Sequence, residues 1–312
     1  MLKNLLSDSH SSIKIIMSIF IMLTVFLALI ILSAIISIPI FNINLSSLQN
    51  ILANPLNPDN INILKFFQTI QSIGLFVLPP FLIVYIIDKK GSFDFLKLKV
   101  KLPIQSILLI VVIMFAAMPV INFLAMLNSK IQLPESFAAL EQSMKASETA
   151  AQKLVEAFLN VNNIGGLFFN IFMIALIPAI GEELIFRGVF QKLFIDLTKN
   201  THWGIILSAF VFSFIHFQFY GFIPRMMMGV LFGYLFVWSG SIWLPILAHF
   251  MNNSIAVVFY YFYGDTVTEQ IDNLGATNES LIYLIFSVII LSFLLLGLYK
   301  ISKQYKAGRL NT

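Results

Sequence analysis

The sequence of 312 residues contains no cysteine, and only 11% of its residues are charged. The lack of cysteine excludes disulfide frameworks, cysteine-ligated zinc, iron–sulfur clusters and thiol catalysis. The scarcity of charge excludes an ordinary soluble domain, in which about a quarter of the residues are charged. Hydrophobic residues make up 59% of the chain, more than one globular core hides. We therefore expect an all-α, polytopic membrane protein.

Eight hydrophobic segments are long enough, or nearly so, to cross about 30 Å of hydrocarbon as helices. The first is about twice as long as the hydrophobic region of a signal peptide, so we interpret it as a retained helix. The fourth contains Pro178 and Gly181, which predict a kink or an unwound turn just before Glu182. The predicted segments are 13–40, 63–87, 102–127, 164–197, 203–219, 222–238, 242–262 and 280–301.

The distribution of charge predicts the orientation of these helices. The net charge is +4, but most cations flank hydrophobic segments, where they indicate topology rather than nucleic-acid binding. With eight crossings, the lysine-rich loops fall on the same side as both termini. The loop 42–62 has no Lys or Arg, and the loop 263–279 has acidic residues without a cation. The positive-inside rule then predicts a cell-membrane protein with both termini in the cytoplasm.

Hydropathy divides the chain into four regions. Residues 1–127 contain the first three predicted transmembrane helices, and residues 164–262 contain the fourth to the seventh. Residues 263–312 contain a loop, the last transmembrane helix and a basic tail. The polar region 128–163 is rich in Ala with interleaved Glu and Lys, which favours a helix. We expect this helix to be amphipathic and to lie at the outer interface, although a solvated helical loop fits the same composition.

The stretch PAIGEELIFRGVF places Glu182, Glu183 and Arg187 inside an otherwise apolar segment. Each ionisable group near the centre of a bilayer costs about 2.5–3.5 kcal/mol. Glu183 and Arg187 are four residues apart, so on a helix they can neutralise each other. Glu182 is rotated by about 100° from Glu183 and can face another partner. The alternative is an ion-pair network that only locks helix packing, but one pair would suffice for that purpose.

His216 and His249 lie in later hydrophobic segments, and Asn253 lies four residues after His249 on the same helical face. Each histidine alone is more often a core residue, but together with the two glutamates they suggest hydrolysis. A carboxylate can take a proton from water, and an imidazole can orient that water or share the proton. A second imidazole and an amide can stabilise the oxyanion of a tetrahedral intermediate.

A divalent metal is the alternative use of these groups, because His and carboxylate side chains bind zinc. Glu182, His216 and His249 would then be the ligands. The sequence has no HExxH motif, and the three ligands come from separate helices, so we expect no cofactor. Arg225 and Gln218 can approach the same cavity, but we favour the alternative that Arg225 extends to the outer interface.

The motifs EELIFR, FSFIH and HFMNN together resemble the CPBP family of intramembrane endopeptidases, which includes the CAAX prenyl endopeptidases and bacterial relatives linked to bacteriocin processing or self-immunity. The three motifs occur in the order of the family, and the likeness covers about 168–260. It implies an intramembrane protease in which Glu182 and His216 activate water, and His249 and Asn253 form the oxyanion site. Glu183 and Arg187 would be the supporting carboxylate and arginine.

The resemblance also implies a glutamate-based mechanism without a metal, although the family carries the older label of metalloprotease. The expected partners are a membrane-associated peptide or protein substrate and the lipid bilayer. Two other functions fit parts of the sequence. One is a non-catalytic self-immunity or scaffold protein of the same family. The other is a proton-coupled transporter, which the absence of matching interruptions in the two halves disfavours.

Overall fold

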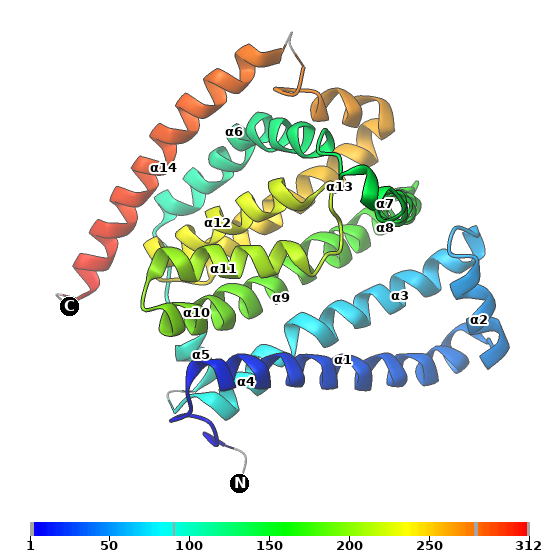
Figure 1. Ribbon diagram of the computed structural model, residues 1–312, viewed down its shortest axis with the longest axis horizontal. Coiled ribbons are helices and arrows are strands. Elements are labelled where there is room, and N and C mark those ends of the chain that lie inside the picture. The colour runs from blue at the N-terminus through cyan, green and yellow to red at the C-terminus, as the bar shows by residue number, and fades with distance from the viewer. Residues whose placement is uncertain (1–2, 90, 278–279, 311–312) are drawn as a thin grey trace.

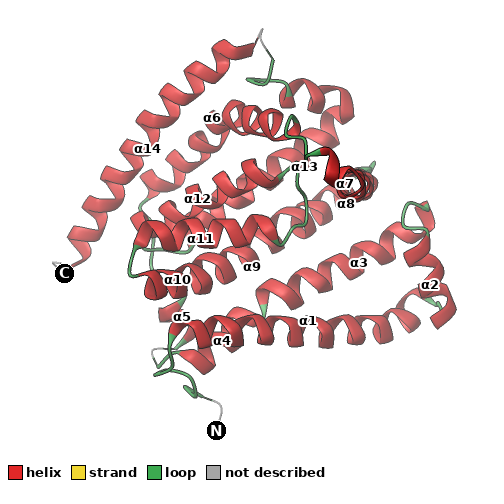
Figure 2. Cartoon of the chain, in the orientation of Figure 1, coloured by secondary structure: helices red, strands yellow, loops and turns green. Residues whose placement is uncertain are grey.

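The computed structural model of the protein describes residues 3–89, 91–277 and 280–310, and every regular element in these ranges is a helix (Figure 2). The predicted all-α fold is therefore confirmed for the described chain. Several charged residues of the predicted loops and tail have side chains outside the described part: Lys90, Asp265, Glu269, Asp272, Glu279 and Arg309.

The first half of the chain begins with a long apolar helix, α1, which packs against the rod formed by α3, a π-helical turn η2 and α4. A polar helix, α7, follows α6 and leads into the second half. The elements are α1 (Ser11–Phe41), α2 (Leu45–Ala53), η1 (Pro58–Asn60), α3 (Ile61–Ser72), η2 (Ile73–Val77), α4 (Pro79–Ile87), α5 (Ser92–Phe95), α6 (Ile104–Ser129), η3 (Glu135–Phe137) and α7 (Ala138–Leu159).

The second half forms the centre of the bundle, where α11 packs on α12 and on α10, and α14 packs on α6. Its elements are α8 (Ile164–Asn170), η4 (Ile171–Leu176), α9 (Ile177–Ile185), η5 (Phe186–Phe190), α10 (Gln191–Thr198), α11 (Thr201–Phe214), α12 (Phe222–Ser239), α13 (Trp243–Asp272) and α14 (Leu281–Leu310). The α13 helix contains a kink at Gly264, where φ is 65°.

The termini and the connecting segments are divided between the two ends of the bundle (Figure 1). Both termini, α5 and the turn between α10 and α11 lie at one end, toward the lower left of the view. The α2 and α7 helices lie at the opposite end. The lysine-rich connections and the termini therefore share one end of the molecule, whereas the assignment of that end to the cytoplasm stays a prediction.

Six helical segments among the described residues are long and apolar enough to cross a membrane. They are Ser11–Phe41, Pro58–Ile87, Ile104–Ser129, Ile164–Thr198, Phe222–Ser239 and Leu281–Gly308. The fifth predicted span corresponds to α11, which has only 14 residues. The seventh corresponds to α13, which is not among the six. A multi-pass membrane protein is thus supported, but the predicted count of eight crossings is not confirmed.

An unwound turn just before Glu182, one of the two expected alternatives, is not found, because Glu182 lies inside α9. A kink at this position stays a prediction. The rod 164–198 runs without an unwound turn and instead contains two π-helical turns, η4 and η5. Pro178 lies in the first turn of α9, directly after η4. A proline lacks the N–H for a regular helical hydrogen bond, and a widened π turn accommodates this loss. The rod therefore stays helical through the polar stretch.

The α9 helix approaches η2 closely because residue 181 is a glycine. A Cβ atom at Gly181 would lie 2.7 Å from the Cβ of Phe76 and 3.0 Å from the carbonyl carbon of Phe76. Both distances are shorter than ordinary van der Waals contact between carbon atoms. This contact fixes the helix that carries Glu182 and Glu183 against the first half of the chain.

A second close approach, between α10 and α11, predicts an effect on stability. A Cβ atom at Gly204 would lie 2.8 Å from the backbone nitrogen of Ile195 and 2.9 Å from its Cα. Because backbone atoms cannot rotate away, we expect Gly204→Ala to lower the free energy of unfolding by about 1–3 kcal/mol. Thermal unfolding in detergent micelles measures the change. In the control Gly308→Ala, the added Cβ meets nothing within 4 Å, and equal melting temperatures of the two variants would contradict the account.

Candidate active site

The three ionisable residues of the predicted motif are buried in the middle of the rod 164–198. Glu182 and Glu183 lie in the last two turns of α9, and Arg187 lies in η5. The exposed fractions are 8% for Glu182, 0% for Glu183 and 1% for Arg187. Charged groups at such low exposure need partners, because the penalty for removing an ion from water is several kcal/mol.

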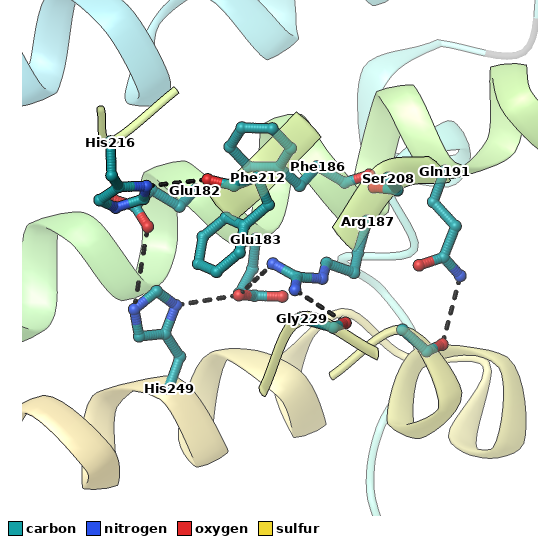
Figure 3. A network of polar contacts seen from close by, with 11 residues as sticks. Glu182, Glu183, Phe186, Arg187, Gln191, Ser208, Phe212, His216, Gly229 and His249 are labelled. Atoms are coloured by element: carbon teal, nitrogen blue, oxygen red, sulfur yellow. Dashed lines mark hydrogen bonds and ion pairs between the residues drawn. The ribbon is translucent and has the colours of Figure 1, made fainter. Parts of the chain in front are cut away.

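The Glu183 carboxylate joins the rod to α13 (Figure 3). Its Oε1 accepts a hydrogen bond of 2.7 Å from Nη1 of Arg187 and lies 2.9 Å from Nδ1 of His249. An ionised carboxylate can only accept, so Nδ1 of His249 is the donor in this contact. One oxygen atom thus holds both the arginine and the histidine ring in place.

Arg187 also contacts a backbone carbonyl and two aromatic rings from α11 and α12. Its Nη2 donates to the Gly229 carbonyl of α12 at 3.0 Å. The guanidinium carbon lies 4.7 Å from the ring centre of Phe212 and 5.3 Å from that of Phe232. The Phe232 ring also stacks on His249, with the ring centres 5.3 Å apart. Such contacts keep the ion pair away from water and favour a single arrangement of both side chains.

Glu182 faces the other nitrogen of the same histidine. Its Oε2 lies 3.9 Å from Nε2 of His249, which is too long for a direct hydrogen bond. A polar pair at this separation suits a bridging water molecule, which can donate to or accept from both groups. The expectation that Glu182 points away from Arg187 toward a different partner agrees with this geometry.

His216 lies outside the helix in which the sequence analysis placed it. The α11 helix ends at Phe214, and His216 lies in the following turn, next to Phe217 with a φ of 52°. Its Nδ1 lies 2.8 Å from the carbonyl oxygen of Phe212. Since a carbonyl oxygen can only accept, Nδ1 carries a proton, and Nε2 of a neutral ring has a free lone pair.

The Phe212 ring connects the two histidines. Its centre lies 5.3 Å from the ring of His216 and 6.1 Å from that of His249, both in edge-on geometry. Figure 3 shows His216 and Glu182 on the same side of this ring. Among the described contacts, however, no hydrogen bond joins Glu182 directly to His216.

Asn253 is half-buried on α13, and its amide is already partly engaged. Its Nδ2 donates to the Ile174 carbonyl in η4 at 3.2 Å, and its Oδ1 accepts from Asn252 at 3.1 Å. One N–H of the amide has no partner in the described contacts. The structure therefore brings Glu182, Glu183, Arg187 and His249 into one network, and it links His216 to that network through Phe212. It gives Asn253 no direct contact with His249.

Gln191 is a buried polar residue of the same rod that was not predicted from the sequence. It is 1% exposed, and its Nε2 donates to the Gly233 carbonyl of α12 at 3.2 Å. Figure 3 shows it in line with Arg187 along the rod. The regular spacing of residues 183, 187 and 191 along one helical face is the pattern that identifies it.

The turn that carries His216 is held by side chains from outside the rod. Asn128 at the end of α6 accepts from the Ile223 backbone N–H at 2.7 Å and donates to the Phe219 carbonyl at 2.8 Å. Glu148 of α7 accepts from the Tyr220 backbone N–H at 3.0 Å. The connection between α11 and α12 therefore has a fixed conformation although it is not helical.

A second contact joins α7 to the same connection. The Glu141 carboxylate accepts from the Tyr220 hydroxyl at 3.1 Å and pairs with Lys145 at 2.7 Å. The hydrogen bond from Lys145 keeps the pKa of Glu141 below its usual value, so the carboxylate stays ionised at neutral pH. The polar region 128–163 thus contains a helix, α7, which is linked to the candidate site by the connection between α11 and α12.

Arg225 lies in the first turn of α12, half-buried, and its Nη2 donates to Gln218. Its charge acts electrostatically on both Glu182 and His216. These interactions agree with an Arg225 that approaches the candidate site rather than one that extends to the outer interface.

The zinc alternative names Glu182, His216 and His249 as ligands, and the absence of a cofactor stays a proposal. Among the described residues, no three His, Cys, Asp or Glu side chains are grouped so that they could hold a metal ion. Glu182, His216 and His249 therefore do not form a ligand cluster in this arrangement, and none of the steps proposed below involves a metal.

Comparison with known protein families finds a match to the same part of the chain. Residues 164–255 match the family model described as "Type II CAAX prenyl endopeptidase Rce1-like". The chain is therefore similar to this family over less than a third of its length. The match contains Glu182, Glu183, Arg187, His216, His249 and Asn253, and the resemblance inferred from the three motifs is confirmed.

Two curated relatives are similar to part of the chain. The membrane-embedded CAAX protease MroQ of Staphylococcus aureus (strain USA300) is 34% identical over 95 residues, which are 28% of this chain and 38% of MroQ. The uncharacterized protein YpbD of Bacillus subtilis (strain 168) is 29% identical over 90 residues, which are 28% of this chain and 43% of YpbD. The chain thus spans about two fifths of the length of these relatives. No solved structure matches it significantly.

The buried ion pair between Glu183 and Arg187 predicts a large effect of removing one charge. We expect Arg187→Met to lower the free energy of unfolding by about 3–5 kcal/mol, because Glu183 would be left buried without its cation. The double variant Glu183→Gln/Arg187→Met removes both charges and keeps an acceptor for His249, so it should recover most of the loss. Chemical denaturation in detergent micelles compares the variants. Equal stability of the single and double variants would show that the buried charge is not the cause.

Proposed function

We propose that the protein is an intramembrane endopeptidase that hydrolyses a peptide bond near the membrane surface. The observation that supports this proposal best is the geometry around His249, which faces one glutamate through each ring nitrogen. Helix packing alone does not require Glu182, because Glu183 and Arg187 already neutralise each other's charges. The match of residues 164–255 to a family model of endopeptidases supports the same activity.

In the proposed reaction, Glu182 is the general base. A water molecule near its carboxylate gives up a proton to it and attacks the carbonyl carbon of the peptide bond. His216 orients this water through Nε2, which is the lone-pair nitrogen of the neutral ring when Nδ1 donates to Phe212. Burial of Glu182 keeps bulk water away from the reacting atoms.

His249 and Asn253 stabilise the negative oxygen that forms in this step. With Nδ1 donating to Glu183, the ring of His249 directs Nε2 toward Glu182, where an N–H at Nε2 can donate to the oxyanion. The unengaged N–H of the Asn253 amide is the second donor. The tetrahedral intermediate then breaks its C–N bond, and Glu182 returns the proton to the leaving amine.

The expected substrate is a peptide or protein that reaches the site from the membrane or its surface. The name of MroQ describes a membrane-embedded CAAX protease, but the sequence of the peptide that this chain would cleave does not follow from that name. We propose the cell membrane as the location, with both termini in the cytoplasm. No cofactor is part of the proposal.

The direct test is cleavage of a peptide library by the purified protein in liposomes. We expect Glu182→Ala and His216→Ala each to lower the rate of cleavage by about 10²–10⁴-fold, the range for loss of a general acid or base. Mass spectrometry of the products identifies the bond that is cut. Glu135→Gln is the matched control, because this glutamate is exposed and lies before α7.

The outcomes separate the competing functions. Unchanged cleavage by Glu182→Ala would refute the assignment of the base. Binding of peptides without cleavage by the wild type would instead support the non-catalytic self-immunity or scaffold function. Proton-dependent uptake of a solute into liposomes would support a transporter.

A separate test concerns the metal. We expect the wild-type cleavage rate to stay unchanged after prolonged dialysis against a strong chelator, because no reaction step proposed here uses a metal ion. Elemental analysis of the dialysed protein confirms that any metal has been removed. Loss of activity that returns when zinc is added back would contradict the glutamate-based mechanism.

A further inference from the structure

A cavity of about 530 Å³ lies between the N-terminal helices and the segment that leads into the rod 164–198, and none of the candidate active-site residues lines it. It is bordered by the end of α1, the first turns of α3 and the segment 161–169 that leads into α8. These elements meet at the end of the bundle that carries α2 and α7, opposite the termini (Figure 1). Three phenylalanines, Phe41, Phe66 and Phe169, form much of its wall.

Lys65 lines this cavity and is only 6% exposed. Its Nζ donates to Oδ1 of Asn170 at 2.9 Å, and Asn170 in turn donates to the Phe158 carbonyl near the end of α7. None of the ion pairs formed by the described residues includes Lys65. Asn170 does not line the cavity. The hydrogen bond to it uses one of the three protons of the ammonium group.

A structural role for Lys65 accounts for only part of this geometry. The chain from Lys65 through Asn170 to Phe158 links α3 to a carbonyl at the C-terminus of α7, where a positive charge is favourable. An amide such as glutamine could make the same link without bringing a charge into the membrane. A buried ammonium without a carboxylate is costly, and the cost falls when an anion binds beside it.

The surroundings indicate which anion would fit. Asn62, Thr69 and Asn163 add polar groups to the lining, while the phenylalanines make the rest of it apolar. Lys65 is one turn from the start of α3 at Ile61, or about 6 Å along the helix axis at 1.5 Å per residue. Lys65 is therefore near one end of the candidate membrane span Pro58–Ile87, and lipid headgroups lie at the ends of such spans. A ligand with an anionic group next to apolar chains matches both the charge and the wall.

We propose that this cavity binds an anionic phospholipid, with its phosphate group beside Lys65 and its glycerol and upper acyl chains against the phenylalanines. The bound lipid would neutralise the Lys65 ammonium and fill the space between α1, α3 and α8. Since α8 continues directly into the rod that carries Glu182, the lipid would stabilise the packing of the N-terminal helices against the candidate active site domain. The site does not depend on the proposed peptidase activity.

The experiment measures binding of defined lipids to the full-length protein. Purified protein is mixed with phosphatidylglycerol, diacylglycerol or soluble glycerol phosphate, and bound molecules are counted by native mass spectrometry. We expect phosphatidylglycerol to bind and to raise the melting temperature, and we expect no binding of diacylglycerol, which lacks the phosphate. Lys65→Gln should weaken phosphatidylglycerol binding by about fivefold or more, whereas Lys65→Arg should retain it.

Lys130→Gln is the matched control, because this lysine is exposed at the end of α6 that leads to α7. If Lys65→Gln does not fold, Asn62→Asp is the second variant. It adds a negative charge to the same cavity at an exposed position and should also weaken binding. Equal phosphatidylglycerol binding by the wild type, Lys65→Gln and Asn62→Asp would overturn the proposal. Preferential binding of soluble glycerol phosphate would overturn the assignment to a membrane lipid.

Discussion

The Glu183 carboxylate is the group on which the arrangement of the site depends. It is completely buried, and one of its oxygen atoms contacts both Arg187 of the same rod and His249 of α13. In a membrane protein, apolar contacts between helices give little specificity, because lipid chains are as apolar as the helix surfaces. The contact between Glu183 and His249 is specific, and it fixes which face of the rod packs against which face of α13. It also leaves Nε2 of His249 directed toward Glu182.

The second constraint is the fixed conformation of the connection between α11 and α12. His216 does not lie on a helix, so its position depends on hydrogen bonds to the backbone around it. Asn128 and Glu148 provide them from α6 and α7, both of which lie before the residues that match the family model. The N-terminal half is therefore more than a membrane anchor. It holds the connection that carries His216, and it forms part of the wall of the cavity around Lys65.

Much of this arrangement follows from the sequence, and the part that does not has physical reasons. The cost of charge in lipid was sufficient to identify Glu182, Glu183 and Arg187, and helical spacing predicted the Glu183–Arg187 contact. Spacing along one helix gives no information about another, so the contact between Glu183 and His249 required the packed structure. The alternative of an unwound turn before Glu182 was wrong, because π-helical turns accommodate Pro178 without unwinding the rod. Gln191 was missed because an amide carries no charge that stands out in an apolar segment.

The central claim is that Glu183 fixes the orientation of His249, with Nδ1 toward Glu183 and Nε2 toward Glu182. Nitrogen-15 NMR of protein labelled at histidine in detergent micelles tests this claim most directly, with the resonances assigned by substituting each of the four histidines. The account predicts that Nδ1 of His249 carries a proton in a hydrogen bond to a carboxylate, and that the resonance of this proton shifts in Glu183→Gln. An unprotonated Nδ1 in the wild type, or a His249 spectrum that is unchanged in Glu183→Gln, would contradict it.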